Sequence, residues 1–229
     1  MIERKKTRQI HIGPVAIGGG APISVQSMCN TRTTDTEGTV AQIKALQAAG
    51  CDIVRLAVPD MEAAKNLGNI IRAVSVPLVA DIHFDYRLAL AAVDSGVQAL
   101  RINPGNIGGP AAIDRVVDAA RAHGISIRVG VNSGSLEKEL LERFGGPTPE
   151  AMVESALTHV RMLEERGFDA IKISLKSSSV PATVAAYTIE RKDFAVTDPL
   201  DPTSSIPVGQ QTSKGIEIAS SLRITDKLL

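Results

Sequence analysis

VPLVADIH, at residues 76–83, is a short apolar run that ends in polar side chains. Four more runs of this kind occur: DIVRLAV at 52–58, VQALRIN at 97–103, ISIRVGVN at 125–132 and FDAIKISL at 168–175. Each run is followed by a stretch of helical character. Fully apolar strands that alternate with helices are typical of a parallel sheet covered on both faces. The repetition therefore predicts an α/β fold.

Six strand–helix units can be counted when the start of the chain is included. APISVQSM at 21–28 is expected to be the first barrel strand, and 8–20 a short β-hairpin before it. Helices are expected over 38–49, 61–73, 86–95, 111–123, 149–166 and 180–191. We predict a TIM-type (β/α) barrel that is incomplete, with about six βα units and a short N-terminal hairpin.

The pattern stops after residue 191. Residues 192–229 hold no long apolar run, and they are too few for the two further βα units of an eight-stranded barrel. We expect 1–191 to form a substrate-binding barrel and 192–229 a divergent tail, with one short helix over 215–224. The chain thus looks like a barrel from which a piece is missing.

Composition limits the function classes. The 229 residues carry 25 basic and 25 acidic side chains, so the formal net charge is zero, whereas nucleic-acid and membrane-surface proteins usually have a basic excess. No apolar stretch approaches the roughly 20 residues that span a bilayer, and the N-terminus lacks the apolar core of a secretory signal. We predict a cytoplasmic protein without nucleic-acid or membrane partners, in which Cys29 and Cys51 stay reduced.

Basic side chains gather at the expected strand ends. The C-terminal ends of barrel strands point into one mouth, and the planar fork of arginine suits phosphate groups. The candidate ligand-binding residues are Arg55, Arg101, Asn103, Arg128, Asn132 and Lys172. One arginine near a strand end is as often part of a structural ion pair. Four cations on successive strands predict a site for a small, strongly anionic ligand.

Asp81 and His83 are the candidate catalytic residues. Asp81 can hold a substrate hydroxyl or orient a neighbouring arginine, and His83 can donate a proton to a leaving oxygen. A histidine that is only a polar residue of the barrel rim is the alternative. No metal site is predicted, because two cysteines without a C-x-x-C run do not hold an iron–sulfur cluster unaided.

Five sequence blocks, in this order, carry a resemblance to a known family: VQSMCNTRTTD at 25–35, VADIHFDYRLAL at 79–90, LRINPGNIG at 100–108, RVGVNSGSLEKEL at 128–140 and IKISLKSS at 171–178. They closely resemble the N-terminal barrel of the 4-hydroxy-3-methylbut-2-en-1-yl diphosphate synthases. The resemblance covers about residues 5–190 and weakens after about 178. It implies reductive ring opening and dehydration of 2-C-methyl-D-erythritol 2,4-cyclodiphosphate in isoprenoid biosynthesis, with the basic positions above lining the substrate pocket.

The resemblance also implies a cofactor and partners. In the family a C-terminal domain holds a [4Fe–4S] cluster on three cysteines and a glutamate, flavodoxin or ferredoxin supplies electrons, and the enzyme is a homodimer. We expect that domain and its ligands to be absent from this chain, which would then bind substrate but be inactive alone. Two alternatives stay open: a transferase resembling dihydropteroate synthase, and a non-catalytic diphosphate-binding barrel.

Overall fold

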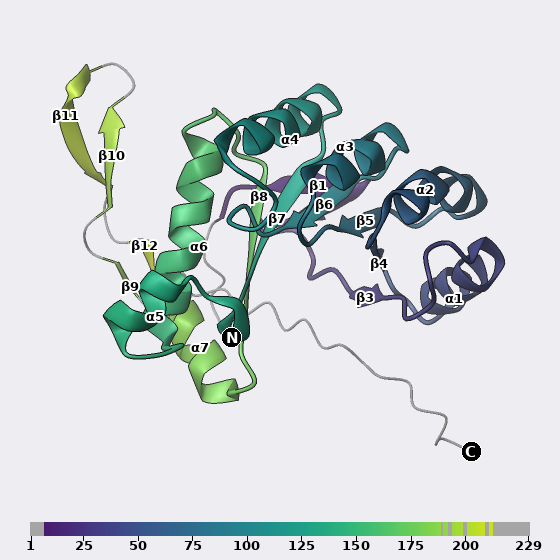
Figure 1. Cartoon of the computed structure of the whole chain (residues 1–229), viewed down its shortest axis with the longest axis horizontal. Coiled ribbons are helices and arrows are strands. Elements are labelled where there is room, and N and C mark those ends of the chain that lie inside the picture. Colours follow the sequence, from purple (N-terminus) through teal and green to yellow (C-terminus); the bar gives the residue numbers. More distant parts are fainter. Residues whose placement is uncertain (1–6, 189, 192–193, 199–200, 209–210, 213–229) are drawn as a thin grey trace. The chain divides into compact units, whose positions relative to one another are not determined.

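The computed structural model describes residues 7–188, 190–191, 194–198, 201–208 and 211–212 (Figure 1). These residues form two compact units. We call residues 7–130 and 157–174 the barrel unit, and residues 131–156 together with the described residues from 175 onward the second unit. Each unit is described by itself.

Six neighbouring strands form the main sheet in the order in which they occur along the chain. They are β3 (Gln26–Met28), β4 (Ile53–Ala57), β5 (Leu78–Asp81), β6 (Ala99–Ile102), β7 (Ser126–Asn132) and β8 (Ile171–Lys176). Strands β3 to β7 pair in parallel, and β5 and β6 are buried along their whole length. The prediction of an incomplete TIM-type barrel with six strands is confirmed.

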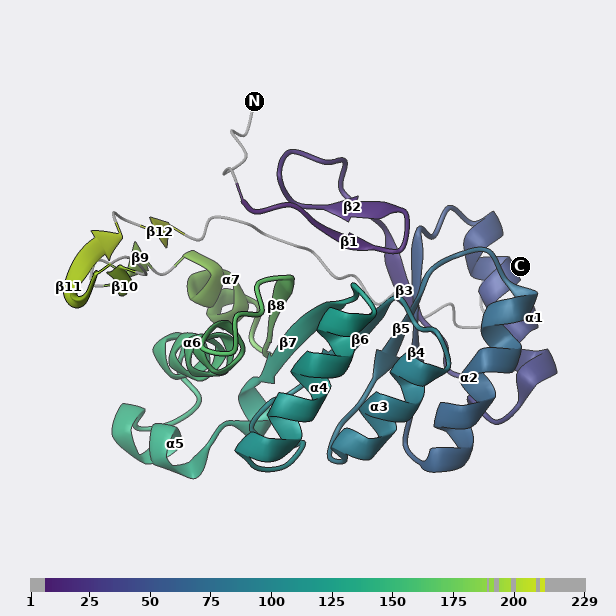
Figure 2. The same cartoon turned by 90° about the horizontal axis from the view of Figure 1, so that it is seen from above.

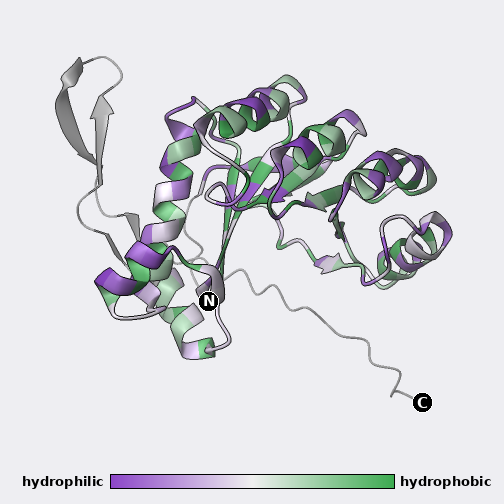
Figure 3. Ribbon diagram, viewed as in Figure 1, coloured by the Kyte–Doolittle hydropathy of each residue, from purple (hydrophilic) through white to green (hydrophobic). Residues whose placement is uncertain are grey.

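Helices follow the strands as the apolar runs indicated. They are α1 (Thr36–Ala48), α2 (Met61–Ala73), α3 (Tyr86–Asp94), α4 (Pro110–Ala122), α6 (Pro149–Glu164) and α7 (Val180–Thr188). An aspartate carboxylate accepts a backbone N–H at the start of α1, α2 and α3, which satisfies a donor that the helix itself leaves unpaired. Figure 2 shows α1 to α4 side by side along one face of the strands. Figure 3 shows that apolar residues concentrate on the strands and on the helix faces turned toward them.

The predicted N-terminal hairpin is present in the barrel unit. Strands β1 (Ile10–Ile12) and β2 (Val15–Ile17) pair antiparallel around a turn at Gly13, whose φ of 55° suits glycine. Ile12 is 3% exposed and packs with Ile53, Val79 and Ala99, so the hairpin shares a core with β4, β5 and β6. The hairpin is therefore part of the barrel unit's core.

Some element boundaries differ from the prediction. The first strand covers Gln26–Met28 rather than 21–28, and the helix expected over 180–191 ends at Thr188, because β9 (Glu190–Arg191) pairs with β12 (Gln211–Thr212). The 3₁₀ helix η1 (Ser133–Ser135) and helix α5 (Lys138–Phe144) were not predicted.

Little of the predicted tail is described. Besides β12, it contains the antiparallel pair β10 (Phe194–Asp198) and β11 (Asp201–Val208). The helix expected over 215–224 lies outside the described residues. The division at residue 191 stays a prediction. Among the described helices, none has the length and apolar character needed to cross a membrane.

Candidate functional site

The register of the parallel sheet sets the charged side chains in one row. Asp81 on β5 is paired with Arg101 on β6, and Arg101 is paired with Arg128 on β7. Paired residues of parallel strands point to the same face, and residues two positions apart on one strand share that face. Val79 and Ala99, which pack against the hairpin, therefore lie on the same face as Asp81 and Arg101. The charged row faces the interior of the barrel unit.

Asp81 is the centre of this row. Nη1 of Arg101 donates to its Oδ1 at 3.1 Å, and Nε of Arg55 lies 3.5 Å from its Oδ2. The side chain of Asp81 is 5% exposed, that of Arg101 10% and that of Arg55 24%. One buried carboxylate thus holds two guanidinium groups from the strands on either side of it. Such charge-assisted contacts are stronger than neutral hydrogen bonds.

Arg55 has a second contact on the other side. Its Nε and Nη2 lie 3.2 and 3.1 Å from the sulfur of Met28 on β3. Burial lowers the pKa of the Arg55 guanidinium, the charge of Asp81 opposes that change, and the charge of Arg101 adds to it. Arginine still remains protonated near neutral pH, because its usual pKa lies far above that range. Arg55 is therefore a fixed cation.

Two further cations come from the next strands. Arg128 and Lys172 are each 8% exposed, and Nη2 of Arg128 donates to Oγ of Ser174 at 2.7 Å. We predicted Arg55, Arg128 and Lys172 at or near the C-terminal ends of their strands. In the structure each of the three lies within its strand. They lie deeper in the barrel unit than the sequence indicated.

His83 and Asn103 occupy different surroundings. The side chain of His83 is 49% exposed, with Nε2 3.8 Å from Asp81 Oδ1 and Nδ1 3.5 Å from Arg101 Nη1. Its ring lies against Phe84, whose exposed fraction is 76%. Asn103 is buried and its Oδ1 accepts the N–H of Gly105 at 3.1 Å, so it orders its own loop.

The structure brings together Arg55, Asp81, His83 and Arg101 by direct contacts, with Arg128 beside them in register. Asn132 belongs to the second unit, and its part in the site stays a prediction.

Three residues of this neighbourhood were missed in the sequence: Met28, Ser174 and Gly130. An alanine Cβ built at Gly130 would lie 2.4 Å from Nε of Arg101. A lone glycine inside a strand pattern, as in RVGVN, is a signal of close approach that could have pointed to Gly130. Met28 and Ser174 carry no such signal.

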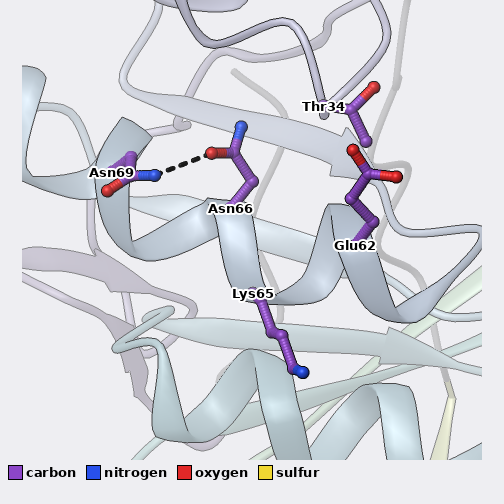
Figure 4. A pocket seen from close by; sticks show the side chains of 5 residues that line it. All are labelled: Thr34, Glu62, Lys65, Asn66 and Asn69. Atoms are coloured by element: carbon purple, nitrogen blue, oxygen red, sulfur yellow. Dashed lines mark hydrogen bonds between the residues drawn. The ribbon is translucent and has the colours of Figure 1, made fainter.

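Two surface hollows lie elsewhere. One of about 240 Å³ is lined by Thr34, Glu62, Lys65, Asn66 and Asn69, where Asn69 donates to Asn66 at 2.8 Å (Figure 4). The other, of about 290 Å³, lies near the hairpin turn and the segments that precede β6 and β7. Neither is lined by a predicted site residue. We take the charged row as the site, because buried charges converge there and not at the hollows.

The two cysteines are buried thiols. Burial raises the pKa of the Cys29 thiol to about 11, and the neighbouring Cys51 adds to the rise. A thiol with so high a pKa is a poor nucleophile near neutral pH. In the described part of the chain, no group of three His, Cys, Asp or Glu side chains could hold a metal ion. These residues do not fit an iron–sulfur cluster.

Comparison with known proteins decides the family. Residues 7–201 match the GcpE TIM-barrel domain. The chain belongs to this family. It is 64% identical over 188 residues to the 4-hydroxy-3-methylbut-2-en-1-yl diphosphate synthase (flavodoxin) of Nitratidesulfovibrio vulgaris, a match that covers 82% of this chain and 49% of that protein. The enzyme of the same name from Maridesulfovibrio salexigens is 63% identical over 196 residues, which cover 85% of this chain and 55% of the relative. The chain spans about half the length of these curated relatives.

Solved structures outside the GcpE family share the fold alone. Type I 3-dehydroquinate dehydratase from Clostridium difficile superposes with a TM-score of 0.57 at 16% identity, covering 80% of this chain and 76% of that one. Dihydropteroate synthase from Yersinia pestis gives a TM-score of 0.52 at 8% identity, and the match covers 72% of this chain and 65% of that one. The strong sequence match to the GcpE family therefore outweighs the dihydropteroate-synthase alternative.

Proposed function

We propose that this chain is the substrate-binding barrel of a 4-hydroxy-3-methylbut-2-en-1-yl diphosphate synthase. Its substrate would be 2-C-methyl-D-erythritol 2,4-cyclodiphosphate, whose ring the complete enzyme opens by a two-electron reduction with loss of water. The observation that carries the proposal is the interior row of Asp81, Arg101 and Arg128, in which Asp81 also holds Arg55 from the row below. The identity of 63–64% to enzymes of that name supports it.

The charge balance of the site suits a diphosphate. Arg55, Arg101, Arg128 and Lys172 are basic side chains of the barrel unit, and Arg101, Arg128 and Lys172 are buried. Charge is weakly screened in buried surroundings, which favours the binding of an anion. Guanidinium groups offer paired N–H donors to the forked oxygens of a phosphate. We propose that Arg101 and Arg128 are the main diphosphate ligands.

The acid and base roles follow from position. Asp81 is fully engaged with two arginines, so we propose that it orients them rather than exchanging a proton. His83 is half exposed and within reach of both Asp81 and Arg101. It is the candidate to protonate the oxygen that leaves when the ring opens, because an imidazolium can donate and then recover a proton. We propose that Asn103 shapes the loop beside them and that Asn132 adds a further substrate contact.

The reduction needs electrons that the described residues do not supply. We propose that a [4Fe–4S] cluster held outside them would supply the electrons, with flavodoxin or ferredoxin as its donor. The names of the curated relatives specify flavodoxin for those enzymes. We further propose that the complete enzyme is a cytoplasmic homodimer. The barrel unit's own contribution is to bind and orient the cyclodiphosphate.

Isothermal titration of this chain with the cyclodiphosphate tests the proposal. Arg101→Ala and Arg128→Ala should each weaken binding about 10-fold or more, because each removes a charge-assisted contact worth about 1.5–3 kcal/mol. Arg121→Ala is the matched control, since Arg121 is an exposed arginine of α4 that pairs with Asp118. Unchanged affinity in both site variants, or an equal loss in the control, would refute the proposed function.

A further inference from the structure

Gly130 is a strand residue whose missing side chain makes room for Arg101. It lies on β7, two positions after Arg128, and so on the interior face. A Cβ built at Gly130 would lie 2.4 Å from Nε, 2.9 Å from Cζ and 2.7 Å from Nη2 of Arg101. Cβ atoms essentially never come within 3.0 Å of such groups. The guanidinium group therefore occupies the space that any other residue at position 130 would fill.

The backbone does not explain this glycine. Gly130 is not among the glycines with positive φ, so an alanine would meet no conformational obstacle in the strand. Glycine in a strand interior otherwise weakens the strand, because it has no side chain to pack and loses more entropy on folding. Space for the guanidinium group is what glycine provides at this position.

The opposite end of the same guanidinium group is fixed by Asp81. Nη1 of Arg101 donates to Asp81 Oδ1 at 3.1 Å and lies 3.5 Å from Nδ1 of His83. Nε, Cζ and Nη2 lie over the Gly130 backbone. Arg101 is thus held between a carboxylate on one neighbouring strand and a bare stretch of backbone on the other.

We propose that Gly130 is a positioning residue for anion binding, because it lets the Arg101 guanidinium lie between Asp81 and β7 where it can contact a diphosphate. The inference rests on the proposed function for the identity of the ligand. A methyl group at position 130 would displace the end of the arginine side chain, since that end moves more readily than a paired strand. Arg101 would then lose its contact with Asp81 and its alignment toward the anion.

The test is a double-mutant cycle on this chain with inorganic pyrophosphate as the probe. Gly130→Ala should weaken pyrophosphate binding about 10-fold, as expected for the loss of one charge-assisted contact. In an Arg101→Ala background the same substitution should have almost no further effect, because the group that it displaces is already gone. Gly68→Ala on α2 is the control: its Cβ would make only ordinary contacts, the nearest at 3.5 Å, and binding should not change.

Several outcomes would overturn the inference. These are full affinity in Gly130→Ala, an equal loss in both backgrounds, or no pyrophosphate binding by the parent chain. If Gly130→Ala does not fold, the melting temperature of the double variant Gly130→Ala/Arg101→Ala tests the steric account instead. A folded double variant, with a measurable melting transition, supports the account because the guanidinium group that clashed is gone. A double variant that is also unfolded contradicts it. If the chain binds pyrophosphate but not the cyclodiphosphate, the proposed function is wrong. The inference about Gly130 would still hold in that case.

Discussion

Asp81 and Arg101 form an ion pair of 3.1 Å between two neighbouring parallel strands whose register sets them directly opposite each other. On the surface of α4, Asp118 and Arg121 form an ion pair of the same length. The two pairs differ in burial: the side chains of the first are 5% and 10% exposed, and those of the second 73% and 49%. Because the N···O distance is the same in both pairs, a difference in their contribution to stability does not come from distance.

Asp81→Ala should lower the free energy of unfolding by about 3 kcal/mol or more, because it leaves two buried guanidinium groups without their counter-charge. Asp118→Ala should change it by about 0.5 kcal/mol or less, as is usual for exposed pairs. Urea denaturation measures both. The buffer must be free of phosphate and sulfate, because an anion bound to the two guanidinium groups left by the substitution would restore stability. Similar effects of the two substitutions would contradict this account of the buried pair.

Ser174→Ala should weaken pyrophosphate binding about 2- to 10-fold, because the Ser174 hydroxyl accepts a hydrogen bond from Arg128 at 2.7 Å and such bonds contribute about 0.5–1.5 kcal/mol. Ser75 offers a matched control, since its exposed hydroxyl accepts a side-chain bond of 2.9 Å from Gln47. Titration calorimetry of the two variants should separate them. Equal affinities would show that Ser174 does not hold Arg128 in its binding position.

Ile12→Ala should cost about 2–4 kcal/mol of unfolding free energy, because the side chain is buried against Ile53, Val79 and Ala99 and its loss leaves a cavity. Ile23 is 76% exposed, so Ile23→Ala should stay within about 0.5 kcal/mol of the parent chain. Thermal and urea unfolding give both values. A small effect at position 12 would mean that the hairpin does not share the core of the barrel unit.

The stability of the chain should fall between about pH 9 and pH 11, in part because of Cys29. Its pKa is about 11 in the folded protein against an ordinary 9.0, so the folded state keeps the proton longer than the unfolded state does. With fewer protons bound in the unfolded state, the free energy of unfolding decreases as the pH rises through this window.

Urea denaturation at pH 8 and pH 10.5 measures that decrease in the parent chain and in Cys29→Ala. The variant should lose less stability between the two pH values, because the titrating thiol is gone. Other groups that titrate in this range, such as lysines and tyrosines, are common to both proteins and cancel in the comparison. An identical decrease in the two proteins would contradict the assignment to Cys29.

Much of the fold could be predicted because apolar strands and helices alternate with a clear period. The same argument identified Asp81 and Arg101, since polar residues at the ends of parallel strands meet at one edge. The seven-residue helix α5 was not predicted, because its sequence is short and mostly charged. Helix α7 ends before residue 191 because Glu190–Arg191 pairs with a segment from farther along the chain, which no local pattern reveals.

The site was only partly predictable for a related reason. The contacts of Met28 with Arg55 and of Ser174 with Arg128 depend on how neighbouring strands are aligned. A single sequence does not specify that register. Nor does it show that Arg128 and Lys172 lie within their strands, because strand ends are defined by pairing with a neighbour. The clearest local signal that went unused was the glycine at position 130.

The apolar side chains next to the charged row affect the electric field of its charges. Val79 and Ala99 lie one row nearer the strand N-termini than Asp81 and Arg101, in register with Arg55, and Ile12 of the hairpin packs against Val79 and Ala99. Hydrocarbon is poorly polarisable, so it screens neighbouring charges less than water does. Walls of low dielectric constant concentrate the field of enclosed charges toward the side where water begins. If the row binds the proposed anion, the packing of the hairpin against Val79 and Ala99 would strengthen that attraction.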